Sequence, residues 1–164
     1  MNLQKLFEMQ HKLDQHIEKE HPQQEGENRR RKKILALLVE IGELANETRC
    51  FKFWSVKPPA PRERQLEEAA DILHFILSIG NDLKIDGEQT IKPHKLAALE
   101  SQFLWLFECV QCLYTEELDQ EATWIETMDV FSGLIEMLGF TWEQIEEAYY
   151  RKNEINHARQ VNKY

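Results

Sequence analysis

The chain has 164 residues, of which 42% are apolar and 30% are charged, so it can bury a core and is expected to form one domain over 1–164. Its net charge of −9 argues against general nucleic-acid binding, which depends on neutralising phosphates. No apolar run reaches the roughly 18 residues that span a bilayer and no signal peptide is visible, so we expect a cytoplasmic protein without a membrane partner.

Apolar residues recur at helical spacing almost everywhere, and Gly and Pro are few, at 6 and 5. These two features predict an all-α fold built as a single bundle of about six helices. In chain order, the helices are expected over 2–20, 28–49, 62–83, 94–116, 121–138 and 141–160.

Breaks between these helices are marked by turn residues and proline. The loops are expected at 21–28, 57–61 (KPPAP) and 82–93. Gly139 is expected to stop the fifth helix, and Thr141 with Gln144 to begin the sixth as a capping box.

The three cysteines, Cys50, Cys109 and Cys112, are odd in number and irregularly spaced, so they indicate a reducing compartment rather than a disulfide framework. Cys109 and Cys112 form a C-x-x-C pair, a spacing also found in zinc and redox sites. Because the pair lies in an apolar helical stretch and no second C-x-x-C occurs, we interpret both residues as part of the core.

Carboxylates line one edge of the predicted second helix. Glu40, Glu43 and Glu47 fall within about 60° of one another at helical spacing, beside the apolar stripe that contains Ile41 and Leu44. Carboxylates next to a core are unfavourable unless they are paired or bind a cation.

The predicted third helix carries Glu68 and Asp71 in a stretch that is apolar nearly all round, while Glu67 is expected to face water. Two carboxylate pairs on neighbouring helices can converge into an oxygen-rich site that suits Mg²⁺ or Mn²⁺. Ordinary solvated helix charge is the alternative. His74, one turn beyond Asp71, fits either a partner of this site or a semi-buried histidine with hydrogen bonds of its own.

One face of the last predicted helix is polar, over an arc of about 120°. It carries Tyr149, Lys152, Asn153, Asn156, Arg159 and Gln160. Lys and Arg can donate to phosphates, and Asn can contact a sugar or base. The alternative is a solvated helix whose cations are favoured by the helix dipole. The basic run NRRRKK (28–33) is interpreted as a solvated helix start rather than a substrate site.

The two carboxylate pairs, Glu40-x-x-Glu43 and Glu68-x-x-Asp71, are separated by 24 residues. They resemble the E-x-x-E…E-x-x-D signature of the all-α nucleotide pyrophosphohydrolases, which include MazG-type enzymes and the dimeric dUTPases. Three further segments resemble the short dimeric dUTPases of Gram-positive bacteria and their phages. They are LFEMQHKLDQHI (6–17), FKFWS (51–55) and the C-terminal pattern Tyr149-x-x-Lys152-x-x-x-Asn156-x-x-Arg159-Gln160. Two departures are Asp14, where Asn is expected, and the ending Asn162-Lys163-Tyr164, where Gly-Tyr is common.

The resemblance implies a homodimer that hydrolyses dUTP to dUMP and pyrophosphate with Mg²⁺, for which Mn²⁺ can substitute. It implies a metal site formed by Glu40, Glu43, Glu68 and Asp71. Glu43 is the first choice for the general base and Glu47 the second. The nucleotide would be held by Gln10, Asp14, Lys52, Trp54, His74, Tyr149, Lys152, Asn156 and Arg159.

Two other functions stay open at this point. One is a MazG-like pyrophosphohydrolase that accepts other nucleoside triphosphates, and the other is a catalytically quiet helical dimer that binds a partner. The apolar stretches at 94–138 exceed what one small bundle needs and predict a homodimer interface. They include Phe103, Leu104, Trp105, Leu106 and Phe107.

Overall fold

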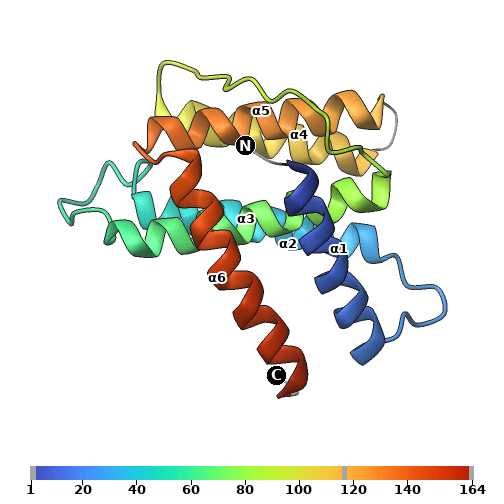
Figure 1. Cartoon of the computed structure of the whole chain (residues 1–164). Helices are drawn as coiled ribbons and strands as arrows, with labels where there is room; N and C mark the ends of the chain where they lie inside the picture. The colour runs from blue at the N-terminus through green and yellow to red at the C-terminus, as the bar shows by residue number, and fades with distance from the viewer. Residues whose placement is uncertain (1–2, 116–117, 163–164) are drawn as a thin grey trace.

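The computed structural model describes residues 3–115 and 118–162, and over these residues it contains six α-helices and no strand (Figure 1). The helices are α1 (Leu3–Glu20), α2 (Arg29–Thr48), α3 (Arg62–Leu83), α4 (Leu99–Thr115), α5 (Gln120–Met137) and α6 (Trp142–Val161). The predicted all-α bundle is confirmed, while residues 2 and 116, the ends of two predicted helices, lie outside the described part. None of the described helices is long and apolar enough to cross a membrane.

Helix α3 occupies the centre of the bundle and packs against α1, α2, α5 and α6. This position explains why its sequence is apolar nearly all round. Helices α4 and α5 pack together as one layer, and α1 and α6 lie across α3 and contact each other (Figure 1).

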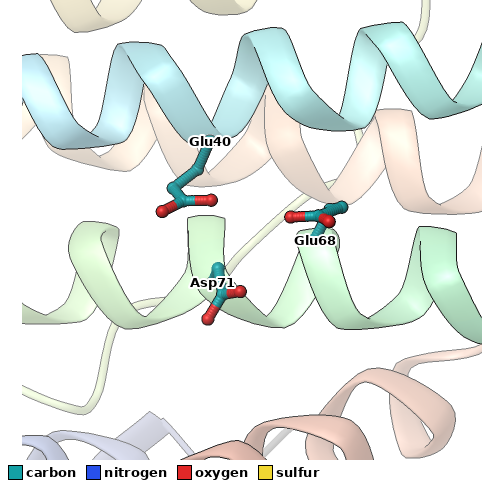
Figure 2. Close-up of side chains that lie close together, drawn as sticks. All are labelled: Glu40, Glu68 and Asp71. Carbon is teal, nitrogen blue, oxygen red and sulfur yellow. The ribbon is translucent and has the colours of Figure 1, made fainter. Parts of the chain in front are cut away.

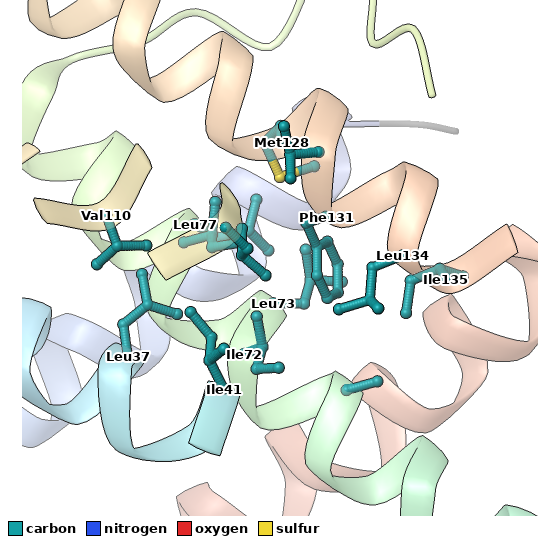
Figure 3. Packing of buried hydrophobic residues seen from close by; sticks show 14 of the residues in the cluster. Leu37, Ile41, Ile72, Leu73, Leu77, Val110, Met128, Phe131, Leu134 and Ile135 are labelled. Atoms are coloured by element: carbon teal, nitrogen blue, oxygen red, sulfur yellow. The ribbon is translucent and has the colours of Figure 1, made fainter. Parts of the chain in front are cut away.

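The core joins α2, α3 and α5 through fully buried side chains (Figure 3). Leu37 and Ile41 of α2 meet the apolar face of α3 that carries Ile72 and Leu73, and Phe131 comes from α5. Burying these residues fixes the rotation of α2 and α3 about their axes. The carboxylates that adjoin the apolar stripes are therefore brought to the seam between the two helices.

The predicted start of α6 is confirmed. Gly139 adopts a left-handed backbone with φ of 73°, which ends the preceding helix. The Thr141 hydroxyl then accepts a hydrogen bond from the Gln144 amide, and the Thr141 amide donates to the Gln144 side chain at 3.0 Å. This capping box directs α6 back across α3 and so places the polar C-terminal face beside it.

The fourth helix begins at Leu99, so the predicted start at residue 94 is wrong. The segment before it is held in an irregular conformation along α5 by long-range hydrogen bonds. The His94 amide donates to the Asp129 carbonyl at 2.9 Å, and the Gln102 side-chain amide donates to the His94 carbonyl at 2.7 Å and to the Val130 carbonyl at 2.8 Å. These bonds replace the ones that a longer helix would make.

This close approach predicts a strong effect of substituting Gly133 of α5. A Cβ atom added at Gly133 would lie 2.0 Å from the His94 carbonyl oxygen, so Gly133→Ala is expected to lower the free energy of unfolding by about 2–4 kcal/mol. Gly42→Ala is the control, because its Cβ would meet nothing within 4 Å and Ala favours the helix by about 0.5–1 kcal/mol. Urea unfolding followed by circular dichroism measures both, and equal midpoints for the two variants would contradict the packing described.

Most of the apolar side chains at 94–138, for which the sequence predicted a homodimer interface, lie in the core of the single chain. Phe103 and Leu106 are buried, and Trp105 and Phe107 are partly buried against the core. Leu104 is strongly exposed, at 63%. The helical spacing of the apolar residues correctly predicted that most of them are buried, but it does not distinguish burial in a core from burial in an interface.

Candidate active site

Three carboxylates meet where α2 packs against α3 (Figure 2). One oxygen each from Glu40 of α2 and from Glu68 and Asp71 of α3 lie within 4.8 Å of one another. The Glu68 residue is buried, and the other two are partly buried. Three of the four residues of the two predicted pairs are thus brought together.

The other two carboxylates of α2 lie beside this cluster. Glu43 is exposed, but its negative charge raises the pKa of Glu40, Glu68 and Asp71 and is therefore close to all three. A Glu47 oxygen lies 3.9 Å from the Arg64 guanidinium. Glu43 and Glu47 therefore lie at the edge of the cluster, where they can contact a molecule bound to it.

Burial and mutual repulsion disfavour the charged forms of the clustered carboxylates. Burial, followed by the charges of Asp71, Glu43 and Glu68, raises the pKa of Glu40 to about 7. Burial also raises the pKa of Glu68 and of Asp71. Oxygen ligands held this close against their own repulsion fit a hard divalent cation, which would remove the repulsion.

In the single chain, cations from outside the cluster pair with two of its members. An Arg64 nitrogen lies 2.6 Å from a Glu68 oxygen, and the Lys152 amine lies 2.5 Å from an Asp71 oxygen. Lys152 comes from α6, so the predicted polar face of α6 is joined to the predicted carboxylate helix. These two ion pairs offset the free-energy cost of burying the charges.

A cavity of about 340 Å³ opens beside the cluster, between α1, the start of α2, α3 and α6, and Asp71 lies on its wall. Its polar lining includes Gln10, Asp14, His74, Ser78 and Asn156, four of which the sequence had assigned to nucleotide binding. Apolar walls come from residues such as Leu13, Ile17 and Phe75. The volume and the mixed lining suit a nucleoside.

Hydrogen bonds fix the polar groups of this cavity. The Gln10 carbonyl accepts from the Tyr149 hydroxyl at 3.0 Å and lies 2.8 Å from Nδ1 of His74, and the Gln10 amide donates to Asp14 at 2.9 Å. The Ser78 hydroxyl lies 2.9 Å from both Asp14 oxygens. These bonds orient the side chains before a ligand arrives.

His74, Asp14 and Tyr149 have shifted pKa values, and burial raises that of Tyr149. Burial lowers the pKa of His74, whose ring stacks on Tyr149 at 4.1 Å, to about 3, so its imidazole is neutral near pH 7. Burial raises the pKa of Asp14, and the nearby positive charge of Lys33 opposes that rise. His74 therefore lines the cavity and is buried, with Nδ1 close to Gln10, whereas its Nε2 atom has no hydrogen-bond partner among the described residues.

A second hollow of about 530 Å³, which we call the cationic groove, lies between the start of α3 and α6. It is lined by Glu63, Arg64, Leu66, Glu67, Ala148, Arg151, Lys152, Ile155 and Arg159. Its four cations exceed its two carboxylates, so it favours an anion. Lys152, which pairs with Asp71, links the groove to the cluster.

Two predicted nucleotide contacts are not brought to this site. Lys52 and Trp54 lie in the loop after α2, and neither is among the described residues that line the cavity or the cationic groove. Trp54 is 65% exposed and packs edge-on against Phe51 and Phe53. The Lys52 amine bonds to the side chain of Asn46.

Several residues of the site were not predicted from the sequence. Arg29 and Lys33 line the nucleoside-sized cavity with side chains only 18% and 17% exposed, so the interpretation of the basic run as a solvated helix start is wrong for these two. They pair with Glu27 and Asp82. Their spacing of four residues, which puts them on one helix face, was the available signal.

Ser78 and Arg64 were also missed. Arg64 stands four residues before Glu68, in the first turn of α3, where a cation opposes the helix dipole. That unfavourable position signals an anionic partner. Ser78 lies one turn beyond His74 on α3, on the face that α1 covers.

The C-x-x-C pair is not part of the site. Cys109 is buried in the core and Cys112 is partly buried, and all three cysteines are free thiols. Burial raises the pKa of Cys109 to about 12, which keeps its thiol protonated and unreactive.

Clustered carboxylates on two helices, a nucleoside-sized cavity and a cationic groove together define a helical nucleoside triphosphate pyrophosphohydrolase. Comparison with known protein families shows a match to the dUTPase family over residues 2–164, and the chain belongs to that family. A search of curated proteins found no match. The activity is accordingly the hydrolysis of dUTP to dUMP and pyrophosphate, and the resemblance to the dimeric dUTPases is confirmed over nearly the whole chain.

Proposed function

We propose that dUTP hydrolysis depends on Mg²⁺ held by Glu40, Glu68 and Asp71, with Glu43 as a further ligand and Mn²⁺ as a substitute. The observation that carries this proposal is the approach of three carboxylate oxygens to within 4.8 Å of one another on α2 and α3. When bound there, a divalent cation supplies Lewis acidity toward the phosphate oxygens and the attacking water.

The general base must accept the proton of the attacking water. Glu43 is the first choice, because it is exposed and lies beside the cluster without being part of its closest contacts. Glu47 is the second choice, and its approach to Arg64 at 3.9 Å holds it at the same edge.

The remaining residues bind the two ends of the substrate. Lys152 and Arg159 offset negative charge on the phosphates from the cationic groove. Gln10, Asp14 and His74, with Asn156 and the supporting Tyr149, hold uracil and deoxyribose in the cavity. An ionised Asp14 accepts hydrogen bonds only, which matches the N3–H of uracil and opposes the N3 acceptor of cytosine. The family resemblance also assigns nucleotide contacts to Lys52 and Trp54, which lie in the exposed loop after α2.

Metal binding is expected to stabilise the protein in a pH-dependent way. The pKa of Glu40 is raised from 4.5 to about 7 in the folded chain, so between these values the folded protein keeps a proton that the unfolded chain releases. The stability of the metal-free protein should therefore fall as pH rises from about 4.5 to 7. Mg²⁺ replaces that proton, so it should raise the melting temperature more at pH 8 than at pH 5.5.

Thermal melts with and without Mg²⁺ at the two pH values measure this effect. Glu40→Gln is the matched control, because it keeps the side-chain shape and removes this titration, and it should weaken the pH dependence of the metal-free melt, to which Glu68 and Asp71 still contribute. An equal Mg²⁺ shift at both pH values, or none at either, would refute the assigned metal site.

We also propose that the chain forms a homodimer. Leu35 and Val39 of α2 are 64% and 50% exposed, and Leu104 lies on α4, which packs against α2. Exposed apolar side chains on two adjoining helices favour contact with a second copy. Sedimentation equilibrium should give twice the 19.5 kDa chain mass, and a monomer at micromolar concentration would disprove this arrangement.

A further inference from the structure

Arg64 bridges carboxylates from both helices of the cluster. Its guanidinium nitrogens lie 2.6 Å from a Glu68 oxygen, 3.1 Å from a Glu67 oxygen and 3.9 Å from a Glu47 oxygen. Nη1, Nη2 and Nε each face one of these partners, so the planar group fills the space between α2 and the first turns of α3.

The pair between Arg64 and Glu68 is unequal in its burial. The Glu68 side chain is 3% exposed, whereas that of Arg64 is 50% exposed, so the guanidinium reaches the buried carboxylate from the cationic groove. A half-exposed guanidinium loses little when it leaves, because water can solvate it. The buried carboxylate is stable in its charged form only beside a cation, since burial of an unpaired charge is strongly unfavourable.

A divalent cation at the cluster would compete for the same Glu68 oxygens. Its charge would also repel Arg64, and the open direction for the guanidinium is the groove that it already lines. Lys152 and Arg159 line the same groove from α6. Their charges and the planar fork of Arg64 form an arrangement that suits a phosphate chain.

We propose that Arg64 moves between two anions during the reaction. Before substrate arrives, Arg64 neutralises Glu68. When a divalent cation is bound at Glu68, the Arg64 side chain turns into the cationic groove and donates hydrogen bonds to the two phosphates that leave as pyrophosphate. This inference rests on the metal site proposed above. It makes the groove the pyrophosphate site and Arg64 a phosphate-binding residue that also sets the metal affinity of the empty enzyme.

The test measures metal binding and pyrophosphate binding separately, in Arg64→Ala and in Arg64→Gln, which keeps a shorter, uncharged side chain that can still form hydrogen bonds. Mn²⁺ titrations of both variants without nucleotide are followed by electron paramagnetic resonance. Both variants should bind Mn²⁺ roughly two- to fivefold more tightly than the wild type, because a partly exposed ion pair contributes a free energy of that size. The inhibition constant of inorganic pyrophosphate, measured with Mg²⁺, should rise roughly tenfold or more in the same variants.

Arg151→Ala is the matched control for metal binding. It removes the same charge from the same groove, but Arg151 pairs with Glu147 at 2.9 Å rather than with the cluster, so Mn²⁺ affinity should stay unchanged. Arg64→Lys keeps a point charge and should restore part of the pyrophosphate affinity.

Unchanged or weaker Mn²⁺ affinity in both Arg64 variants would overturn the inference, because a residue that merely orients Glu68 would weaken metal binding when removed. Unchanged pyrophosphate inhibition would overturn it as well. If the metal site is wrongly assigned, the result is different. The wild-type protein would then bind no Mn²⁺, or the Asp71→Asn variant would bind Mn²⁺ with the same affinity as the wild type.

Discussion

Glu68→Gln is expected to lower Mg²⁺-dependent turnover of dUTP by roughly a thousandfold or more, while circular dichroism shows the same helical content. Glu68 is the most buried member of the cluster, with a side chain 3% exposed, and it lies close both to Glu40, within 4.8 Å between oxygens, and to the Arg64 guanidinium, at 2.6 Å. Gln keeps the volume but loses the charge that a divalent cation requires.

The neighbouring Glu67→Gln is the matched control. Glu67 is 56% exposed, as the sequence analysis predicted, and it contacts Arg64 from the solvent side. It has the same chemistry and adjoins Glu68 in sequence, so a comparable loss in both variants would show that the effect comes from general charge rather than from the assigned site. Full activity of Glu68→Gln would remove the cluster from the reaction.

Lys152→Ala should have the second largest effect, a loss of about ten- to a hundredfold in kcat/KM for dUTP. Lys152 is held 2.5 Å from Asp71 by α6, with its side chain 17% exposed, and it stands between the cluster and the cationic groove. Removing it takes away a charge-assisted contact to the phosphates and leaves Asp71 without its ion-pair partner.

Steady-state kinetics of Lys152→Ala and Lys152→Arg separate these contributions. Arg keeps the positive charge and should recover most of the lost kcat/KM, whereas Ala should not. If Lys152→Ala retained wild-type kinetics, α6 would serve only to cover α3, and the role of the groove in binding phosphates would have to be abandoned.

The helices and the carboxylate cluster were predictable because both depend on spacing along a helix. Ile41 and Leu44 fix which face of α2 is buried, and Glu40 adjoins that face in any packing that buries them. The same reasoning applied to α3, where Asp71 precedes Ile72 and Leu73. The helical period therefore located the carboxylate cluster without knowledge of the contacts.

Contacts between distant segments were not predictable in this way. The start of α4 depends on bonds from His94 and Gln102 to α5, and the burial of Phe103 depends on what covers it. The contacts of Arg64 with Glu47 and Glu68 depend on the distance between α2 and α3, which spacing within one helix does not contain. Lys33 likewise lines the cavity together with residues of α1 and α3, which are distant from it in the sequence.

Pyrophosphate release from dUTP, dCTP, dTTP and UTP in the presence of Mg²⁺ tests the central claim most directly. The hydrogen-bonded groups of Gln10, Asp14 and His74 predict that kcat/KM for dUTP exceeds that for dCTP by roughly a hundredfold or more. The carboxylate cluster predicts that removing the metal abolishes release. Equal rates for all four nucleotides, or pyrophosphate release from dUTP that persists without a divalent cation, would contradict the assignment of the cavity and of the carboxylate cluster.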